Sequence, residues 1–552
     1  MKGGEGGDDV GNEGASSAER VGDGDDLDGR IWGLALPAVA SLLLDPVLGA
    51  VDTAFVGRIE GEGAAAALGG LAIATTVFNF SFKVFNFLAV VTGPLVATQI
   101  AAAQRAEAEA ENETGAWGSL DDDAAARPGR GAAAETVAGA MTLAVVLGVS
   151  AFAALEIGSD QIIGWAGGDA ADAVTSGGPS LTSEAEAYLR VRALSAPAAL
   201  VGTVAVGAYR GLLDTRTPLV VSGLTNVVNL ALDPILIFGL GPVPAFGVAG
   251  AAAATTAAEW ASAVVFWVLL TREGLLPPGG NIFASLLPSS SSTAGAGDGE
   301  ASDSTDESAP AQPPSGVSEW AQKLKPLAAG SASQLARTLL LQAVLVRATA
   351  EAAGVDAAGA HQICIQVWWV TLFALDALAV AAQSLVAAAL GSGDVATARR
   401  AADRTLKWAL AAGTAVGVGI AASGPLLPAL FTTDAETAAA AEGPLRLVAA
   451  LQPLNAAIFV GDGVLQGAAD FDYLAMAMAA AAAPALGSLA MTGGAAAGSG
   501  LGVVWRSMAL LQIGRATTLA ARYWGKDGPV SLPSDGGVTS SEGEEKGPDA
   551  AQ

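Results

Sequence analysis

Stretches of 20 or more mostly apolar residues recur along almost the whole chain. A segment of about 20 apolar residues can cross the hydrocarbon core of a bilayer as a helix. Only 15% of the residues are charged, against about 25% in an ordinary soluble protein. The sequence therefore predicts an all-α polytopic membrane protein that contacts the lipid bilayer over most of its length.

Twelve membrane spans can be placed on the apolar stretches. The expected ranges are 31–57, 65–103, 132–157, 184–212, 217–240, 245–271, 320–349, 357–391, 396–423, 443–468, 472–492 and 500–522. Several are longer than a bilayer requires, so we expect them to tilt or protrude.

Three polar, acidic segments divide the chain and carry much of its net charge of −27. Their Gly, Ser, Pro, Asp and Glu content cannot bury enough apolar surface to fold, so we expect disorder there. The predicted organisation follows the chain order: tail 1–30, first lobe 31–271, cytoplasmic linker 272–319, second lobe 320–522 and tail 523–552.

Lys and Arg gather on one side of the predicted spans, in the loops that join even-numbered spans to the next. Because positive loops stay on the cytoplasmic side, both termini are expected in the cytoplasm or, for a plastid envelope protein, in the stroma. The acidic start, with no apolar core, predicts neither a signal peptide nor a transit peptide. The membrane is left open between the plastid envelope and the plasma membrane.

Several function classes have no sequence support. One cysteine, Cys364, and one histidine, His361, exclude a disulfide framework and a Cys/His metal cluster. No basic patch with interleaved aromatics indicates nucleic-acid binding. No phosphate loop, nucleophile elbow or zinc-protease motif is present. We therefore expect no enzyme activity, no ATP drive and no cofactor beyond a coupling ion.

The two apolar halves contain related sequences. Gly207–Asp214 and Gly463–Asp470 both have the pattern Gly-x₃-Gly-x₂-Asp, 256 positions apart. Leu95-Val96-Ala97 likewise matches Leu385-Val386-Ala387, which lies 290 positions later. Each match joins spans that are six apart in the predicted order. The pattern indicates a parallel repeat of two six-helix halves, an arrangement used by secondary transporters.

Acids in the first half are the main candidates for chemistry, because a charged group in the membrane interior is costly and faces protein or water. Asp45 and Asp52 lie seven positions apart in the first span and share a helix face, next to Pro46. Asn226, Asn229 and Asp233 form one polar stripe on the span 217–240. Lys83 on the second span would need an acid of the first or fifth span as its partner. For each set the alternative is a structural role between helices.

Polar residues in the second half are candidates for substrate binding or ion relay. Asp376 lies on the span 357–391 and Asp462 on the span 443–468, each with amide side chains on the same face. Taken singly, such residues are also typical of hydrogen bonds between membrane helices.

These motifs resemble the multidrug and toxic compound extrusion (MATE) transporters, in particular the DinF-like branch with plant and algal members. The likeness covers roughly residues 30–525. Its motifs in chain order are Leu36-Pro37, Asp45-Pro46, Val51–Gly57, Phe78–Phe80, Phe85–Leu88, Tyr188–Ala193, Arg210–Thr215, Asn229–Pro234, Ala360–Ile363 and Leu375-Asp376.

The resemblance implies two six-helix bundles that form a V-shaped cavity and export organic compounds in exchange for H⁺ or Na⁺. The first-lobe acids proposed as proton sites in DinF-like members match Asp52 and Asp233, with Asn229 beside the latter. A glutamate that some eukaryotic members carry on the seventh helix has no match in 334–349.

We expect an H⁺-coupled antiporter that exports a small organic compound such as a xenobiotic, an organic acid or a phenolic, and that acts as a monomer. Two alternatives remain within the same superfamily, a Na⁺-coupled exporter and a flippase for lipid-linked precursors. A membrane enzyme and a non-transporting scaffold are the rivals from other classes.

Overall fold

The structure is a computed structural model. It describes residues 26–56, 84–114, 130–165, 181–277, 315–354, 358–432, 435–492 and 501–531, with shorter pieces between 58 and 82. The predicted tails 1–30 and 523–552 and the linker 272–319 lie largely outside these residues. All the extended elements that it describes are helices.

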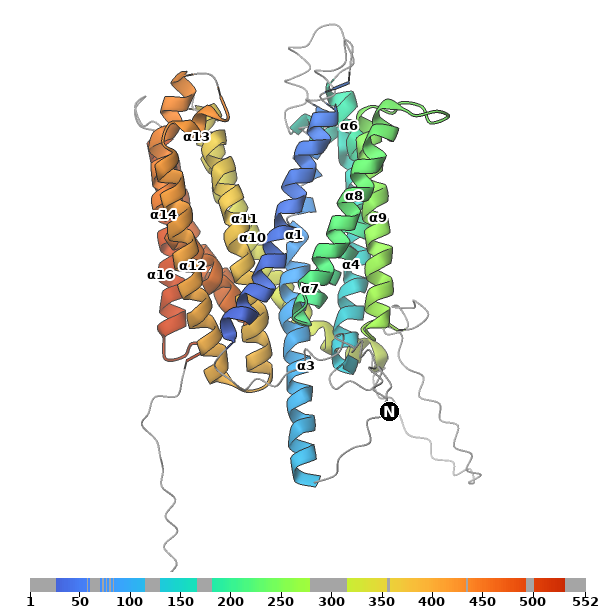
Figure 1. Cartoon of the computed structure of the whole chain (residues 1–552), viewed down its shortest axis with the longest axis vertical. Helices are drawn as coiled ribbons and strands as arrows, with labels where there is room; N and C mark the ends of the chain where they lie inside the picture. The colour runs from blue at the N-terminus through green and yellow to red at the C-terminus, as the bar shows by residue number, and fades with distance from the viewer. Residues whose placement is uncertain are drawn as a thin grey trace, which may run out of the picture.

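Figure 1 shows two groups of helices that meet at one end of the molecule and diverge toward the other. We call the group from the first half the N-lobe. Its helices are α3 (Phe87–Thr114), α4 (Arg130–Trp165), α6 (Leu181–Ala193), α7 (Ala196–Gly211), α8 (Arg216–Phe238) and α9 (Val248–Arg272), with the 3₁₀ turn η1 (Val84–Asn86) before α3.

The group from the second half is called the C-lobe. Its helices are α11 (Ala358–Gly391), α12 (Val395–Ser423), α13 (Leu426–Ala429), α14 (Ala435–Gly467), α15 (Phe471–Thr492) and α16 (Leu501–Trp524). Two further helices, α1 (Leu27–Val56) and α10 (Ser315–Gly354), are the first helices of the two halves of the chain, and each packs against both lobes.

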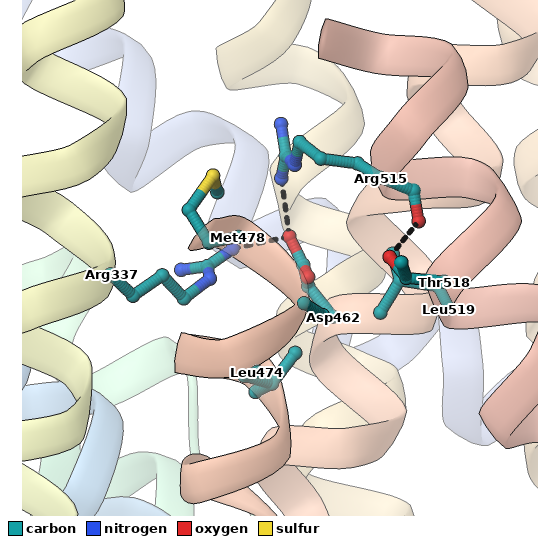
Figure 2. Close-up of a pocket in the computed structure, with 8 residues that line it drawn as sticks. Arg337, Asp462, Leu474, Met478, Arg515, Thr518 and Leu519 are labelled. Carbon is teal, nitrogen blue, oxygen red and sulfur yellow. Dashed lines mark hydrogen bonds and ion pairs between the residues drawn. The ribbon is translucent and has the colours of Figure 1, made fainter. Parts of the chain in front are cut away.

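Nine helices in the described part of the chain are long and apolar enough to cross a membrane, or ten if α6 and α7 count as one bent span. We predicted twelve spans from the sequence. The two predicted spans that are absent from the count of ten correspond to α10 and α16, whose apolar character is diluted by polar side chains. Arg337 and Arg515 on these helices point toward Asp462 of the C-lobe (Figure 2).

The predicted span 184–212 is not one helix. It is broken at Leu194 and Ser195 into α6 and α7, which are inclined to each other by 53°. Pro197 lies in the first turn of α7. A proline there cannot donate to the preceding turn, so the helix restarts instead of continuing.

The repeat predicted from the glycine motifs has a structural counterpart. Gly207 of α7 packs against the backbone of Ala89 on α3, and Gly463 of α14 packs against Ala379 on α11. The two glycines are 256 positions apart, and their two partners are 290 positions apart, the same offsets as in the sequence matches. Small residues permit such close helix contacts in membranes. The two halves therefore pack in the same register.

The crossing helices connect the lobes. The first half of α1 buries Ile31 and Leu34 with residues of α11 and α12, whereas Val56 near its end lies in an N-lobe cluster. In the same way α10 places Leu327 in an N-lobe cluster and Val344 in the C-lobe core. The helices α1 and α10 therefore each link the two lobes by packing.

Candidate functional site

Two buried acids meet in the N-lobe. Asp52 on α1 is 8% exposed and Asp233 on α8 is fully buried. Their carboxyl groups lie close enough to interact electrostatically with each other. No Lys or Arg of the described residues forms an ion pair with either acid, and neither oxygen of Asp233 has a hydrogen-bond partner among these residues. Since a carboxylate can only accept, the two groups bond to each other only when one carries a proton.

An amide and a hydroxyl extend this pair toward α9. Asn229, one turn before Asp233, donates from Nδ2 to Oγ1 of Thr255 at 2.8 Å, and Thr255 donates to the carbonyl of Ala251. The Oδ1 atom of Asn229 has no partner among the described residues. Pro234, inside α8, removes a backbone donor beside the acid. The site thus contains several oxygen atoms that have no hydrogen-bond partner, and the backbone hydrogen bonding of α8 is weakened beside them.

Asn226 is not part of the pair. The predicted stripe placed it with Asn229 and Asp233, but its Nδ2 donates to the carbonyl of Ser222 on its own helix at 2.9 Å. Its side chain is only half-buried. A back-bonded amide of this kind has its hydrogen-bonding capacity used locally.

An ion pair that we did not predict lies beside the acids. Arg192 on α6 donates to both carboxylate oxygens of Glu259 on α9, at 2.8 and 2.5 Å, and its guanidinium stacks 4.0 Å from the ring of Phe78. Arg192 is also within electrostatic range of Asp52. The sequence did contain a signal for this pair. An arginine and a glutamate each lie inside an apolar span, where a charged side chain requires a partner of opposite charge.

Two predicted residues of this lobe cannot be placed. Lys83 lies outside the described residues, so its predicted pairing with an acid stays a prediction. Asp45 lies on α1, two turns before Asp52, but its side chain is also outside the described part.

The C-lobe holds its buried acid differently (Figure 2). Oδ2 of Asp462, on α14, accepts hydrogen bonds from both Arg337 of α10 and Arg515 of α16, the latter at 2.5 Å. Arg515 also donates to Oε1 of Gln512 at 3.1 Å, and Gln512 donates to Oδ1 of Asn455 at 2.6 Å. We predicted Asp462 as a candidate, but neither Arg515 nor Gln512.

Asp376 lies near this cluster without joining it. The half-buried carboxylate on α11 interacts electrostatically most strongly with Arg210 of α7, and more weakly with Asp462 and Arg337. The positive charge of Arg210 in the N-lobe and the negative charge of Asp376 in the C-lobe therefore attract each other across the two lobes.

His361 and Cys364 take packing positions. His361 is buried against the Trp505 ring, 5.6 Å between centroids, and Cys364 lies 3.6 Å from the carbonyl of Ala441. Within the described residues no cluster of three potential metal ligands occurs.

Comparison with known proteins identifies the family. The MatE family model matches residues 129–235 and 331–492. Protein DETOXIFICATION 44, chloroplastic, from Arabidopsis thaliana is 32% identical over 507 residues, which cover 91% of this chain and 83% of that protein. The chain belongs to the MATE family. It is also similar to DNA damage-inducible protein F from Escherichia coli, with 29% identity over 45% of this chain and 44% of that protein.

Solved MATE structures share the fold. The crystal structure of MATE in the bent conformation has a TM-score of 0.66 at 17% identity and covers 90% of this chain and 94% of that one. The outward-facing structure of a multidrug resistance MATE family transporter also has a TM-score of 0.66 at 17% identity, with 92% and 97% covered. The predicted fold class and the predicted family are confirmed. This MATE protein is a multi-pass membrane transporter and not an enzyme.

Proposed function

We propose that this protein is an H⁺-coupled antiporter that exports a small organic compound, and that Asp52 and Asp233 share the coupling proton. The observation that carries the proposal is the burial of two acids that lie close enough to interact electrostatically, with no ion-pair partner for either in the described residues. Like charges in one buried site cannot both ionise readily, so such a pair holds a proton. A site that binds and releases one proton is the minimum equipment for proton coupling.

The two states differ in the charge of the pair. A shared proton permits a hydrogen bond between Asp52 and Asp233 and draws α1 toward α8. Loss of that proton leaves two carboxylates that repel, and α8 can yield beside Pro234. Because the first half of α1 packs on the C-lobe, its displacement changes how the lobes meet. The proton shifts this equilibrium only by its different affinity for the two states.

Sodium is the second candidate for the coupling ion. Hard cations prefer oxygen ligands, and the unpartnered oxygens of Asp233 together with Oδ1 of Asn229 are of that kind. A flippase for lipid-linked precursors would require a larger and more cationic cavity.

The proposed setting is a plastid envelope. The Arabidopsis relatives DETOXIFICATION 44 and 45 are both named chloroplastic. The distribution of Lys and Arg favours termini on the stromal or cytoplasmic side. We propose a monomer as the working unit, since each chain contains both lobes.

Reconstitution tests the coupling. Purified protein in liposomes with an internal pH dye would receive candidate compounds across an imposed pH gradient, with and without Na⁺. Substrate-dependent proton movement without Na⁺ supports the proposal. Movement that requires Na⁺ would replace the proton by sodium, and headgroup translocation without solute exchange would favour the flippase.

A further inference from the structure

We propose that the Arg192–Glu259 ion pair sets how readily the Asp52–Asp233 pair takes up its proton. In this account the charge of Arg192 favours the ionised acids, and Glu259 limits that effect by holding the guanidinium group. The inference rests on the proposed function and deepens it, because it names the residues that regulate the coupling site. No ion pair joins Arg192 to either acid within the described residues, so both residues act on the proton from outside the site.

One face of α9 connects the ion pair to the acid site. Thr255 and Glu259 lie four positions apart on this helix and therefore share a face. Thr255 accepts the hydrogen bond from Asn229, one turn before Asp233, and Glu259 accepts two hydrogen bonds from Arg192. The same face of α9 thus supports the acid site at one level and fixes the guanidinium group one turn further along.

Further contacts hold the guanidinium group of Arg192 in place. It stacks over the Phe78 ring, 4.0 Å from the ring centre, and it also donates to Oγ of Ser195. Beside it, Thr256 of α9 donates to the backbone carbonyl of Val191 on α6 at 3.1 Å, which ties the two helices together. The positive charge of Arg192 therefore has a fixed position next to the acid site.

This fixed charge acts on Asp52. Arg192 lies within electrostatic range of Asp52, and Tyr188, one turn before Arg192, lies within range of Asp52, Arg192 and Glu259 together. Tyr188 and Arg192 are both buried, so little water is present to screen the charges. A neighbouring positive charge favours the ionised form of a carboxyl group. Because Glu259 binds Arg192 through both carboxylate oxygens, part of the positive charge is cancelled before it reaches Asp52.

The other charged groups on the elements around the ion pair are engaged elsewhere or exposed. They are Arg190, Glu186 and Asp160 at the edge of α6 and α4, Arg58 beyond α1, and Arg210 of α7, which interacts with Asp376 of the C-lobe. Lys83 lies outside the described residues and is left unchanged in every variant below. Differences between the variants therefore report on Arg192 and Glu259 alone.

The two members of the ion pair should have opposite effects on the proton. In Glu259→Gln the charge of Arg192 is no longer offset, so the acid pair stays ionised down to a lower pH. In Arg192→Gln that charge is lost, so the acid pair keeps its proton up to a higher pH. We expect a shift of about one pH unit in each direction, the size that a nearby charge produces. A merely structural ion pair predicts the same effect from the loss of either member.

Infrared difference spectroscopy of the full-length protein in liposomes tests these shifts, because it detects the carbonyl stretch of a protonated carboxyl group without a substrate or an ion gradient. Each variant is titrated with and without Asp233→Asn, and the difference isolates the signal of the acid pair. The double variant Arg192→Gln/Glu259→Gln, which removes both charges, should titrate close to the natural protein, and so should Arg192→Lys, which keeps the charge. Glu186→Gln, at an i,i+4 pair with Arg190 on α6, is the matched control and should not shift the titration.

Shifts of the same sign in Glu259→Gln and Arg192→Gln, or no shift in either, would overturn the inference. If one single variant does not fold, the other decides by comparison with the double variant: Glu259→Gln should titrate at a lower pH than the double variant, and Arg192→Gln at a higher pH. An acid pair with no titrating signal would contradict the proposed function and this inference with it. A signal that titrates but ignores these substitutions would contradict the inference alone.

Discussion

The two lobes hold their buried acids in different electrostatic surroundings. In the N-lobe Asp52 and Asp233 contact each other, and the nearby Arg192 is engaged by Glu259. In the C-lobe Asp462 is held by two arginines. A pair of acids is stabilised by adding a proton, whereas an acid between two arginines is stabilised by remaining ionised. We therefore propose proton exchange for the N-lobe pair, whereas the C-lobe acid has its charge balanced by the two arginines.

The helix packing, by contrast, is the same in both lobes. Gly207 and Gly463 allow equivalent close approaches, and the turns that follow them repeat in detail, with Asp214 donating its amide to the carbonyl of Tyr209 and Asp470 to that of Leu465. The same helix packing in the two lobes thus supports two different kinds of charged site.

Neutralising the acids should change stability in opposite directions. Asp462→Asn leaves two buried arginines without their counter-ion and should lower the free energy of unfolding by about 3–5 kcal/mol. Asp52→Asn removes repulsion from Asp233 and should leave stability equal or higher. Thermal unfolding in detergent measures both. The control Glu442→Gln, at an exposed i,i+4 pair with Arg446, should shift stability by less than about 1 kcal/mol. Equal losses in the two aspartate variants would remove the contrast between the lobes.

The glycine contacts should respond with the same sign and unequal size. An added Cβ at Gly463 would lie 2.4 Å from the carbonyl oxygen of Ala379, and one at Gly207 would lie 2.8 Å from that of Ala89. Gly463→Ala should therefore cost about 1–3 kcal/mol through overpacking, and Gly207→Ala less. Gly487→Ala in α15, where a Cβ meets open space, serves as the tolerated control. Stability as high in Gly463→Ala as in Gly487→Ala would mean that the packing register is wrong.

The smallest effect concerns the repeated turn. Leu213 and Ala469 have positive φ angles of 60° and 56°, a conformation that favours glycine. Ala469→Gly should raise the free energy of unfolding by less than about 1 kcal/mol, because an exposed methyl group is lost and the strain is relieved. Leu213→Gly should lower it, since Leu213 packs on the cluster that joins α1 to the C-lobe. Chemical denaturation of the two variants side by side would show whether the strain is common to both turns.

The fold and the family could be predicted from the sequence because apolar length and repeated motifs are local signals. Asp52, Asp233 and Asp462 could be identified because acids are rare in membrane spans. Their partners could not be identified in this way. The contact of Asp52 with Asp233 and that of Asp462 with Arg515 join different helices, and periodicity within one helix says nothing of which faces meet. Asn226 shows the limit, since it shares the spacing of Asn229 and Asp233 but bonds to its own helix.

The break between α6 and α7 was missed for a related reason. Pro197 marked the break, but the apolar composition continues through it.

Proton movement by the Asp233→Asn variant is the most direct test of the central claim, that the N-lobe acid pair carries the coupling proton. The variant would be compared with the natural protein and with Glu442→Gln in liposomes with an internal pH dye, at equal amounts of inserted and folded protein. We predict that substrate-dependent proton movement disappears in Asp233→Asn and persists in Glu442→Gln. Unchanged proton-coupled exchange in Asp233→Asn would contradict the claim.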